Sequence, residues 1–355
     1  MNGAAPSADL RSSDRVVSVI APARNERAYI EPFCASALAQ RLPLGWTLEL
    51  LIADGMSDDG TRDVLARLAA ADPRIQWFDN PRRIVSSGLN AGIGRARGDV
   101  IVRMDVHTRF ADDYVAQCLA ALEASGADNV GGPWRATAEP GAHPTQHAVA
   151  AAFQSRWVSG GALSRRLDYD GAADTVYLGC WPRRTFERFG TFDEALVRNQ
   201  DDEHNLRITL GSGKIWQASG IRSEYRPRAA LRQVYRQYLQ YGYWKPFVMR
   251  KHGQPASLRQ LVPGLFVLGL CLFALAGAAG APAWPLAALL AAYAAAVFAM
   301  TMAVRRGQVL GPSILARIPA VIVTYHLSYG VGSLIGWWDV LWHRNGRARF
   351  ATLTR

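Results

Sequence analysis

The sequence contains few cysteines, and no two of them stand in a C-x-x-C spacing. Four cysteines are spread over 355 residues, at Cys34, Cys118, Cys180 and Cys271. We therefore expect reduced cysteines that serve as small apolar side chains. The first 15 residues are polar and include no apolar core, so a secretory signal peptide is also lacking. The globular part is accordingly expected to stay in the cytoplasm.

A glycine-rich loop for dinucleotides is missing too. Such a loop has the spacing G-x-G-x-x-G and directly follows a strand. Here the first apolar run, Val16 to Ile20, ends in Ala-Pro-Ala-Arg-Asn, and the pair Gly92 and Gly94 falls inside a predicted helix. This excludes a nicotinamide-dependent dehydrogenase, which the alternation of strands and helices would otherwise allow.

Charged residues are absent from two long stretches near the C-terminal end, residues 261–281 and 283–304. Each has about 20 residues, which is enough to cross a bilayer. The loop between them has no cation, whereas basic residues flank their outer ends, so the positive-inside rule places those ends in the cytoplasm. A third apolar stretch, 319–338, contains His326 and several glycines. If this stretch spans the membrane, the arginine-rich tail 344–355 lies outside, against the positive-inside rule. If the stretch is re-entrant, the tail stays in the cytoplasm, and both possibilities stay open.

Basic residues are abundant overall, with a formal net charge of +11 and a pI near 9.9. Many of them lie in residues 226–260, where tyrosines and a tryptophan are interspersed. We interpret this segment as an amphipathic interfacial element that delivers a lipid-linked acceptor, with Gln237, Tyr241 and Trp244 as candidate contacts. The same composition could bind nucleic acid by stacking, but the apolar stretches that follow favour the membrane, so no nucleic-acid partner is expected.

The part before residue 226 has the pattern of an α/β domain, preceded by a disordered leader at residues 1–14. Short apolar strands alternate with helices; the strands are expected at 16–20, 48–53, 75–78 and 100–104, and the helices at 30–40, 61–71 and 87–97. This alternation predicts a mostly parallel sheet with helices on both faces. Ligands bind such sheets beyond the carboxyl ends of the strands, where polar clusters follow the first, second and fourth strands. Residues 134–175 show little periodicity and suggest long loops.

Three polar clusters have side chains suited to sugar transfer. Asp105 and His107 follow the fourth strand, point the same way and could meet one divalent metal. Asp54 closes the second strand and could accept hydrogen bonds from a nucleoside. Asp201 and Asp202 begin an acidic run just before a helix, where mutual repulsion would raise one pKa to a value suited to a general base.

These clusters resemble the motifs of family 2 glycosyltransferases. Residues 22–26 are similar to the family's P-x-x-N-E segment, and residues 54–61 to its D-x-S-x-D-x-T segment. Asp105-Val106-His107 falls where the family has D-x-D, and Gln200-Asp201 where it often has E-D. The resemblance covers residues 16–225. Together, the D-x-H variant, the run at residues 199–203 and the membrane tail resemble the succinoglycan-type exopolysaccharide glucosyltransferases of bacteria.

The resemblance implies a GT-A fold over residues 15–225, a Rossmann-like mixed sheet, followed by C-terminal transmembrane helices. It also implies a metal, Mn²⁺ or Mg²⁺, on Asp105 and His107, and Asp201 as catalytic base. The implied donor-nucleotide pocket comprises Pro22, Asn25, Glu26, Asp54, Ser57 and Asp105. Asp202 is a further candidate contact to the acceptor. His107 and Gln200 depart from the family pattern. The histidine leaves the identity of the metal open, and the glutamine leaves the base position occupied by Asp201.

The expected activity is inverting transfer of one hexose, glucose from UDP-glucose by resemblance, to a lipid-linked saccharide in exopolysaccharide biosynthesis. The protein would be a multi-pass protein of the bacterial inner (plasma) membrane with a cytoplasmic catalytic domain. The Q-x-x-R-W motif of processive polymerases is incomplete near Gln237, which favours a single addition. Two alternatives remain, a polyprenyl-phosphate acceptor and a non-catalytic membrane protein that binds nucleotide sugars. Intact Asp105 and Asp201 argue against the second.

Overall fold

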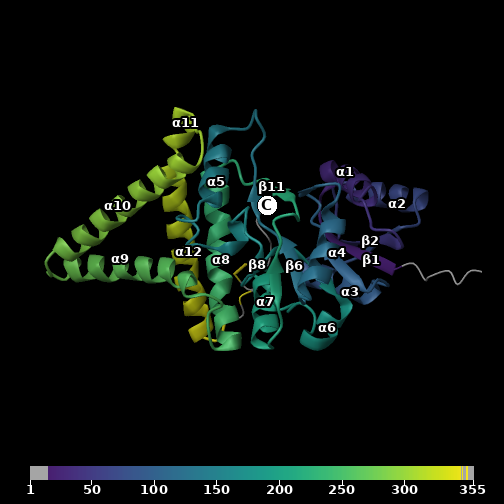
Figure 1. The fold of residues 1–355 in the computed structure, drawn as a ribbon. Coiled ribbons are helices and arrows are strands. Elements are labelled where there is room, and N and C mark those ends of the chain that lie inside the picture. Colours follow the sequence, from purple (N-terminus) through teal and green to yellow (C-terminus); the bar gives the residue numbers. More distant parts are fainter. Residues whose placement is uncertain (1–14, 345, 347–348, 351–355) are drawn as a thin grey trace, which may run out of the picture.

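The computed structural model describes residues 15–344, 346 and 349–350 (Figure 1). The expected leader at 1–14 and most of the tail beyond residue 344 lie outside the described residues. The described chain consists of an α/β body and a helical part that follows it in sequence, with the helices α9 and α10 projecting away from the body (Figure 1).

Eight strands form the central sheet in the order β3-β2-β1-β4-β9-β6-β10-β8. They are β1 Arg15–Ala23, β2 Trp46–Asp54, β3 Ile75–Asp79, β4 Val100–Arg103, β6 Asn129–Gly132, β8 Gly171–Ala172, β9 Tyr177–Pro182 and β10 Ile215–Gln217. β3, β2, β1 and β4 are mutually parallel, whereas β9 runs antiparallel to both β4 and β6. The predicted mixed, mostly parallel sheet is therefore confirmed.

Helices cover both faces of this sheet. They are α1 Arg27–Leu38, α2 Thr61–Ala71, α3 Val85–Arg95, α4 Tyr114–Ser125, α6 Arg183–Phe189 and α7 Gln200–Leu210. α1, α2 and α4 pack with one face of the strands, and α3, α6 and α7 with the other. The strands are apolar on both faces because both are covered, which is the usual composition of parallel sheets. Three of the four cysteines are buried in this body, as expected of small apolar side chains, and Cys271 is exposed on α9.

The segment 134–175, expected as long loops, contains regular structure. It includes α5 Pro144–Gln154, the short turn η1 Leu163–Arg165 and the strand β7 Arg135–Ala136. β7 joins β11 Ser223–Tyr225 and β5 Arg109–Phe110 in a second, three-stranded sheet. The alanines of α5 give a weak periodicity, because alanine contributes little contrast between a buried and an exposed face, and α5 is held by packing instead.

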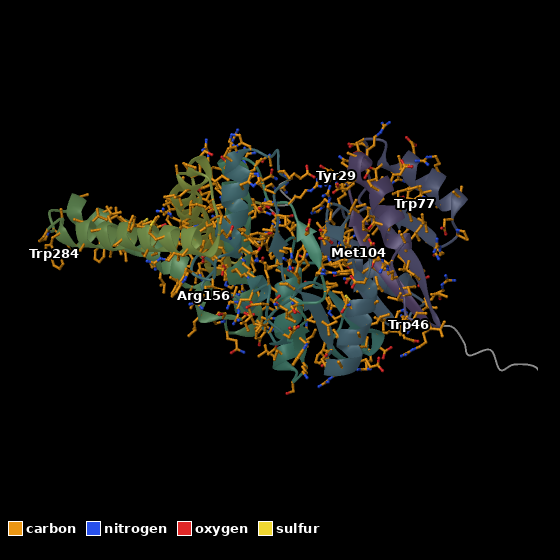
Figure 2. All side chains as sticks on the ribbon, turned by 45° about the horizontal axis from the view of Figure 1, so that its top comes forward. Tyr29, Trp46, Trp77, Met104, Arg156 and Trp284 are labelled. Carbon is orange, nitrogen blue, oxygen red and sulfur yellow. The ribbon has the colours of Figure 1, made fainter. Side chains whose placement is uncertain are left out.

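The helical part begins with α8 Leu231–His252 and the turn η2 Leu258–Gln260. It continues with α9 Val262–Ala278, α10 Trp284–Gly307, α11 Pro312–Leu315 and α12 Ile318–Leu341. Three helical stretches among the described residues are long and apolar enough to cross a membrane: Leu258–Ala278, Trp284–Gly307 and Pro312–Leu341. α9 and α10 form a hairpin with Trp284 at its far tip (Figures 1 and 2).

Two aromatic residues of α8, the helix that forms most of the segment expected at the membrane interface, lie in the interior of the protein. Tyr243 and Trp244 are buried between α8, α12 and the body. Glycines allow this close approach: a Cβ on Gly332 or Gly336 of α12 would lie 2.1 or 2.3 Å from a carbonyl oxygen of α8. The aromatic residues of α8 are largely interior because α12 covers them, which no pattern within α8 alone reveals.

Candidate active site

A cavity of about 440 Å³ lies at the carboxyl ends of the parallel strands, where ligands bind in open α/β sheets. Its wall contains six arginines against three carboxylates. The arginines are Arg24, Arg83, Arg103, Arg198, Arg226 and Arg228, and the carboxylates are Glu26, Asp105 and Asp201. This excess of positive charge suits a ligand that carries phosphates.

The loops after β1 and β2 are joined by hydrogen bonds at the rim of the cavity. Asn25 adopts a left-handed backbone conformation (φ 54°), and its backbone N–H donates to Ser57 Oγ at 2.8 Å. Ser57 in turn donates to Asp54 Oδ1 at 2.5 Å, and Arg62 Nη1 donates to Asp54 Oδ2 at 2.9 Å. Asp54 is fully buried, so its carboxylate fixes the two loops and is not itself exposed to the cavity. Asp59 Oδ1 accepts from the backbone N–H of Thr61 at 3.0 Å.

At the end of β4, a buried arginine forms an ion pair with the aspartate of the D-x-H segment. Arg103 Nε and Nη2 donate to the two oxygens of Asp105 at 2.8 and 2.9 Å. Although burial opposes ionisation, this guanidinium holds the pKa of Asp105 below its usual range. His107 is half-exposed, with Nδ1 3.6 Å from Glu26 Oε1. Asp105 therefore enters the cavity as a carboxylate.

The side chains near Asp105 offer oxygen and nitrogen donors of the kinds that a divalent metal binds. Within the described residues, no group of three or more His, Cys, Asp or Glu side chains is placed to hold an ion by itself. Asp105 supplies carboxylate oxygens with lone pairs beyond those used by Arg103, and His107 supplies an imidazole nitrogen with Glu26 beside it. Magnesium-type sites often use one or two carboxylates and complete the shell with substrate phosphates and water. The residues fit a metal held jointly with a diphosphate.

Asp201 lies at the first turn of α7 and lines the cavity. Burial and the adjacent Asp202 raise its pKa, against the opposing fields of Arg103 and Lys245. One Asp201 oxygen accepts the backbone N–H of Asp202 at 3.0 Å, and Lys245 of α8 forms an ion pair with Asp202. A carboxylate with a raised pKa binds a proton more readily, as a general base must.

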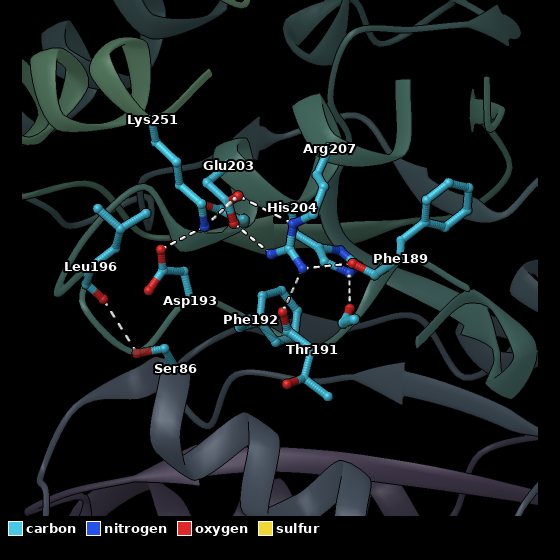
Figure 3. A network of polar contacts seen from close by, with 12 residues as sticks. Ser86, Phe189, Thr191, Phe192, Asp193, Leu196, Glu203, His204, Arg207 and Lys251 are labelled. Carbon is cyan, nitrogen blue, oxygen red and sulfur yellow. Dashed lines mark hydrogen bonds and ion pairs between the residues drawn. The ribbon is translucent and has the colours of Figure 1, made fainter. Parts of the chain in front are cut away.

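Helix α8 holds the whole segment that carries Asp201. Arg198 Nε donates to Gln240 Oε1 at 2.6 Å, and Asn199 Nδ2 donates to the carbonyl of Tyr241 at 3.0 Å. Further along α7, the buried Glu203 accepts from Lys251 at 3.0 Å (Figure 3). Burial alone would raise the pKa of Glu203, but the cations around it, Arg207 first among them, lower it to about 2. We call these contacts between α8 and residues 198–203 the α8 clamp.

Three aromatic side chains also line the cavity and were not anticipated from the sequence. Trp134 stacks on Tyr177, with ring centroids 4.9 Å apart, and meets Tyr225 edge-on at 5.5 Å. All three line the cavity, as do the unanticipated Arg198 and Arg228. Of the cavity residues that were not anticipated, Arg103 alone had a recognisable signal in the sequence, because it is a charged residue at the end of an apolar strand.

The structure brings most of the predicted site residues together. The cavity wall includes Pro22, Asn25, Glu26, Asp105, His107, Asp201, Gln237 and Tyr241. Four predicted residues are not part of that wall. Asp54 and Ser57 lie behind it in the loop network, Asp202 faces Lys245, and Trp244 packs against Tyr243 and Phe247 in the interior. Trp244 is therefore a structural residue of the α8–α12 interface in this structure.

Sequence comparisons identify relatives over nearly the whole chain. The protein is 30% identical over 329 residues to the succinoglycan biosynthesis protein ExoA of Rhizobium meliloti (strain 1021), which covers 90% of this chain and 96% of that protein. It is 25% identical over 243 residues to a dolichyl N-acetyl-α-D-glucosaminyl phosphate 3-β-D-2,3-diacetamido-2,3-dideoxy-β-D-glucuronosyltransferase of Methanococcus voltae, covering 66% of this chain and 74% of that one.

The fold also has solved counterparts. A mannosyltransferase from Pyrobaculum calidifontis, solved with GDP-Man and Mn²⁺, superposes with a TM-score of 0.58 at 20% identity, over 91% of this chain and 87% of that chain. This likeness confirms the expected GT-A fold. A sequence model described as Glycosyl transferase family 2 matches residues 18–185, the part that builds most of the cavity. With the cavity, the motifs and the ExoA relationship in agreement, the chain belongs to glycosyl transferase family 2.

Proposed function

We propose that this glycosyltransferase moves a single hexose from a UDP-sugar, glucose in the first instance, onto a lipid-linked saccharide with inversion at the anomeric carbon. The observation that carries the proposal is the convergence of Asp105, His107 and Asp201 on one arginine-rich cavity. Such a cavity offers what the reaction needs: positive charge for the departing diphosphate and a carboxylate for the attacking hydroxyl.

The donor lies along the ends of β1 and β4. Pro22, Asn25 and Glu26 line the nucleoside side of the cavity, and the buried Asp54 and Ser57 keep that rim in place through their hydrogen bonds. The arginines of the wall neutralise the diphosphate. A divalent metal, Mn²⁺ or Mg²⁺, bound at Asp105 and His107 would add positive charge against the leaving group.

The transfer itself is a single in-line displacement at the anomeric carbon. The Asp201 carboxylate takes the proton of the acceptor hydroxyl, whose oxygen forms the new bond from the face opposite the diphosphate. The bond from the anomeric carbon to the diphosphate oxygen breaks, and its electron pair leaves with the nucleoside diphosphate. The raised pKa of Asp201 strengthens it as a base, and the α8 clamp fixes its position.

The acceptor enters from the side of Gln237, Tyr241 and the aromatic wall. Trp134 and Tyr177 offer flat apolar surfaces of the kind on which a sugar ring can lie. The ExoA relative is named for succinoglycan biosynthesis, and the Methanococcus voltae relative for a sugar attached to dolichyl phosphate. The first name favours exopolysaccharide biosynthesis and the second favours a lipid-linked saccharide as the acceptor, with a bare polyprenyl phosphate as the second candidate. The protein acts at the cytoplasmic face of the bacterial plasma membrane.

Donor turnover tests the proposal directly. The full chain, purified in detergent, is supplied with radiolabelled UDP-glucose, Mn²⁺ and a bacterial lipid extract, and label in the lipid fraction is expected. Replacing Asp201→Asn should abolish transfer and spare UDP binding, because only the base is lost. Asp168→Asn, which alters a carboxylate with 81% of its side chain exposed, serves as the control.

The outcomes separate the parts of the proposal. Turnover retained by Asp201→Asn rejects Asp201 as the base. UDP binding without labelled lipid rejects glucose or the supplied acceptors, and a panel of other UDP-sugars and polyprenyl phosphate then identifies the pair. UDP binding without transfer from any sugar of the panel favours the non-catalytic alternative, and a protein that neither transfers label nor binds the nucleotide rejects a UDP-sugar as the donor.

A further inference from the structure

Helix α12 lies against α5 of the α/β body in its first half and against α8 at its end. Near its start, Tyr325 donates through its hydroxyl to the carbonyl of Val149 in α5 at 3.2 Å. Near its end, Asp339 accepts from Tyr243 at 2.8 Å, and Arg250 donates to the carbonyl of Val340 at 3.1 Å. Protein therefore covers α12 both in its first half, where it meets α5, and at its end, where it meets α8, and 44% of the most apolar 18-residue window of this stretch is buried.

The glycines of α12 show how tightly it is attached to α8. A Cβ on Gly332 would lie 2.1 Å from the carbonyl oxygen of Leu239, and one on Gly336 would lie 2.3 Å from that of Tyr243. Small residues of this kind let two helix backbones touch. If α12 crossed the bilayer, α8 would have to enter the hydrocarbon beside it. Transfer of α8 into lipid would cost much free energy, because the helix carries Arg232, Arg236, Lys245, Arg250 and Lys251.

The hairpin of α9 and α10 has the opposite geometry. Both of its roots lie on α12: a Cβ on Gly330 would meet Pro263 of α9, and Val304 of α10 packs with Ile318. From these roots the hairpin runs away from the body and across the direction of α12 (Figure 1). Only 11% and 17% of its two apolar stretches are buried in protein. At 1.5 Å per residue, α9 and α10 are about 26 and 36 Å long, which brackets the roughly 30 Å of bilayer hydrocarbon.

We propose that α9 and α10 alone cross the membrane, and that α12 lies in the plane of the cytoplasmic interface with the body resting on it. With the bilayer normal along the hairpin, α12 faces lipid on one side and α8 on the other. Trp338 and Trp342, exposed at the end of α12, then sit at headgroup level, while Trp284 marks the opposite interface at the hairpin tip (Figure 2).

This arrangement removes the conflict in the charge pattern of the sequence. With only two spans, the arginine-rich tail 344–355 stays on the cytoplasmic side, as the positive-inside rule requires. Arg305 and Arg306 at the end of α10 and Arg259 before α9 lie on that side as well. The surface that α12 presents is therefore apolar along its length and basic around it, which suits a bilayer with anionic headgroups.

Cysteine accessibility tests the sidedness. In a Cys271→Ala background, whose other cysteines are buried, single cysteines are introduced as Ala281→Cys at the hairpin tip, Val309→Cys between α10 and α11, and one appended after Arg355. Spheroplasts are treated with a membrane-impermeant maleimide before and after lysis. We expect the tip cysteine to react in intact spheroplasts, and the other two only after lysis.

The contrary outcomes are distinct. An appended cysteine that reacts in intact spheroplasts, while Val309→Cys does not, means that α12 crosses the membrane and overturns the proposal. A tip cysteine that reacts only after lysis, or in neither preparation, means that the hairpin does not cross. Transfer activity has no part in this readout, so the proposed function can fail independently.

Depth along α12 gives a second measurement. Nitroxide labels at Ala320→Cys, Leu327→Cys and Trp338→Cys, in vesicles of phosphatidylethanolamine and phosphatidylglycerol, should show nearly equal accessibility to oxygen. A helix in the membrane plane keeps all three at one depth. A pronounced maximum at Leu327→Cys, the centre of the helix, would indicate a span and refute the proposal.

Discussion

The substitution Gly332→Ala tests whether the packing of α12 on α8 supports the active site. A Cβ at this position would lie 2.1 Å from the carbonyl oxygen of Leu239, whereas ordinary contact begins at 3.4 Å. Neither atom belongs to a flexible side chain, so the two helix backbones must separate by about 1.3 Å. Gly277→Ala in α9 is the matched control, because nothing lies within 4 Å of its new Cβ.

The expected loss of stability follows from this overlap. Forcing extra volume into a packed contact costs typically about 1–3 kcal/mol. Both substitutions gain about 1 kcal/mol of helix propensity, which cancels in the comparison. The free energy of unfolding of Gly332→Ala should therefore fall about 1–3 kcal/mol below that of Gly277→Ala. For a chain of this size that corresponds to a Tm roughly 1–4 °C lower.

The activity should fall as well, because α8 bears the clamp that positions Asp201. A displacement of the catalytic segment by about 1 Å can reduce the rate by up to roughly 100-fold. UDP binding should be retained, since the loops after β1 and β2 are held by their own hydrogen bonds. The two proteins are compared by thermal unfolding in detergent, by kcat for transfer and by UDP affinity.

The reasoning would be refuted by a Gly332→Ala protein as stable and active as Gly277→Ala, because the overlap would then be relieved without cost. A protein with lowered Tm but unchanged kcat would separate the two steps. It would mean that α12 stabilises α8 without positioning the catalytic segment.

Three further predictions concern the base and the metal. Asp202→Asn removes the negative neighbour that raises the pKa of Asp201, so this pKa should fall and the acid limb of the kcat/KM profile should move to lower pH. An unmoved limb would contradict Asp201 as the base. Lys245→Met removes a cation that lowers the pKa of Asp201, and it leaves Asp202 without its ion-pair partner, so the acid limb should move to higher pH and the protein should lose about 1–3 kcal/mol of stability. Lys245→Arg should restore both the position of the limb and the stability. His107→Ala should raise the Mn²⁺ concentration for half-maximal transfer at least about tenfold, and an unchanged metal titration would remove His107 from the site.

The sequence by itself determined the central sheet and the position of the site. The segments before Asp54 and Asp105 are mostly apolar because both faces of those strands are covered, and such segments are visible locally. Parallel strands end at one edge, so the clusters that follow them had to converge there. The hairpin of α9 and α10 was equally visible, since long runs without charge can be recognised in the sequence whatever covers them.

Only the tertiary structure decided which partner each polar or aromatic side chain meets. Asp54 is enclosed by Ser57 and Arg62, and Asp105 is gripped by Arg103, although both aspartates end comparable strands. Trp134 reaches the cavity from a segment with no periodic signal. These pairings join residues that are distant in sequence or depend on how loops close, and no local pattern encodes them.

The same limit applied to the helices after the body. The aromatic residues of α8 and the apolar stretch of α12 each have the composition of elements that meet a membrane. The structure packs Tyr243 and Trp244 inside and sets α12 along the body, because glycines on both helices permit backbone contact. An apolar helix surface must be covered, but the sequence of that helix does not show whether lipid or protein covers it. The shape of the facing helix decides between the two.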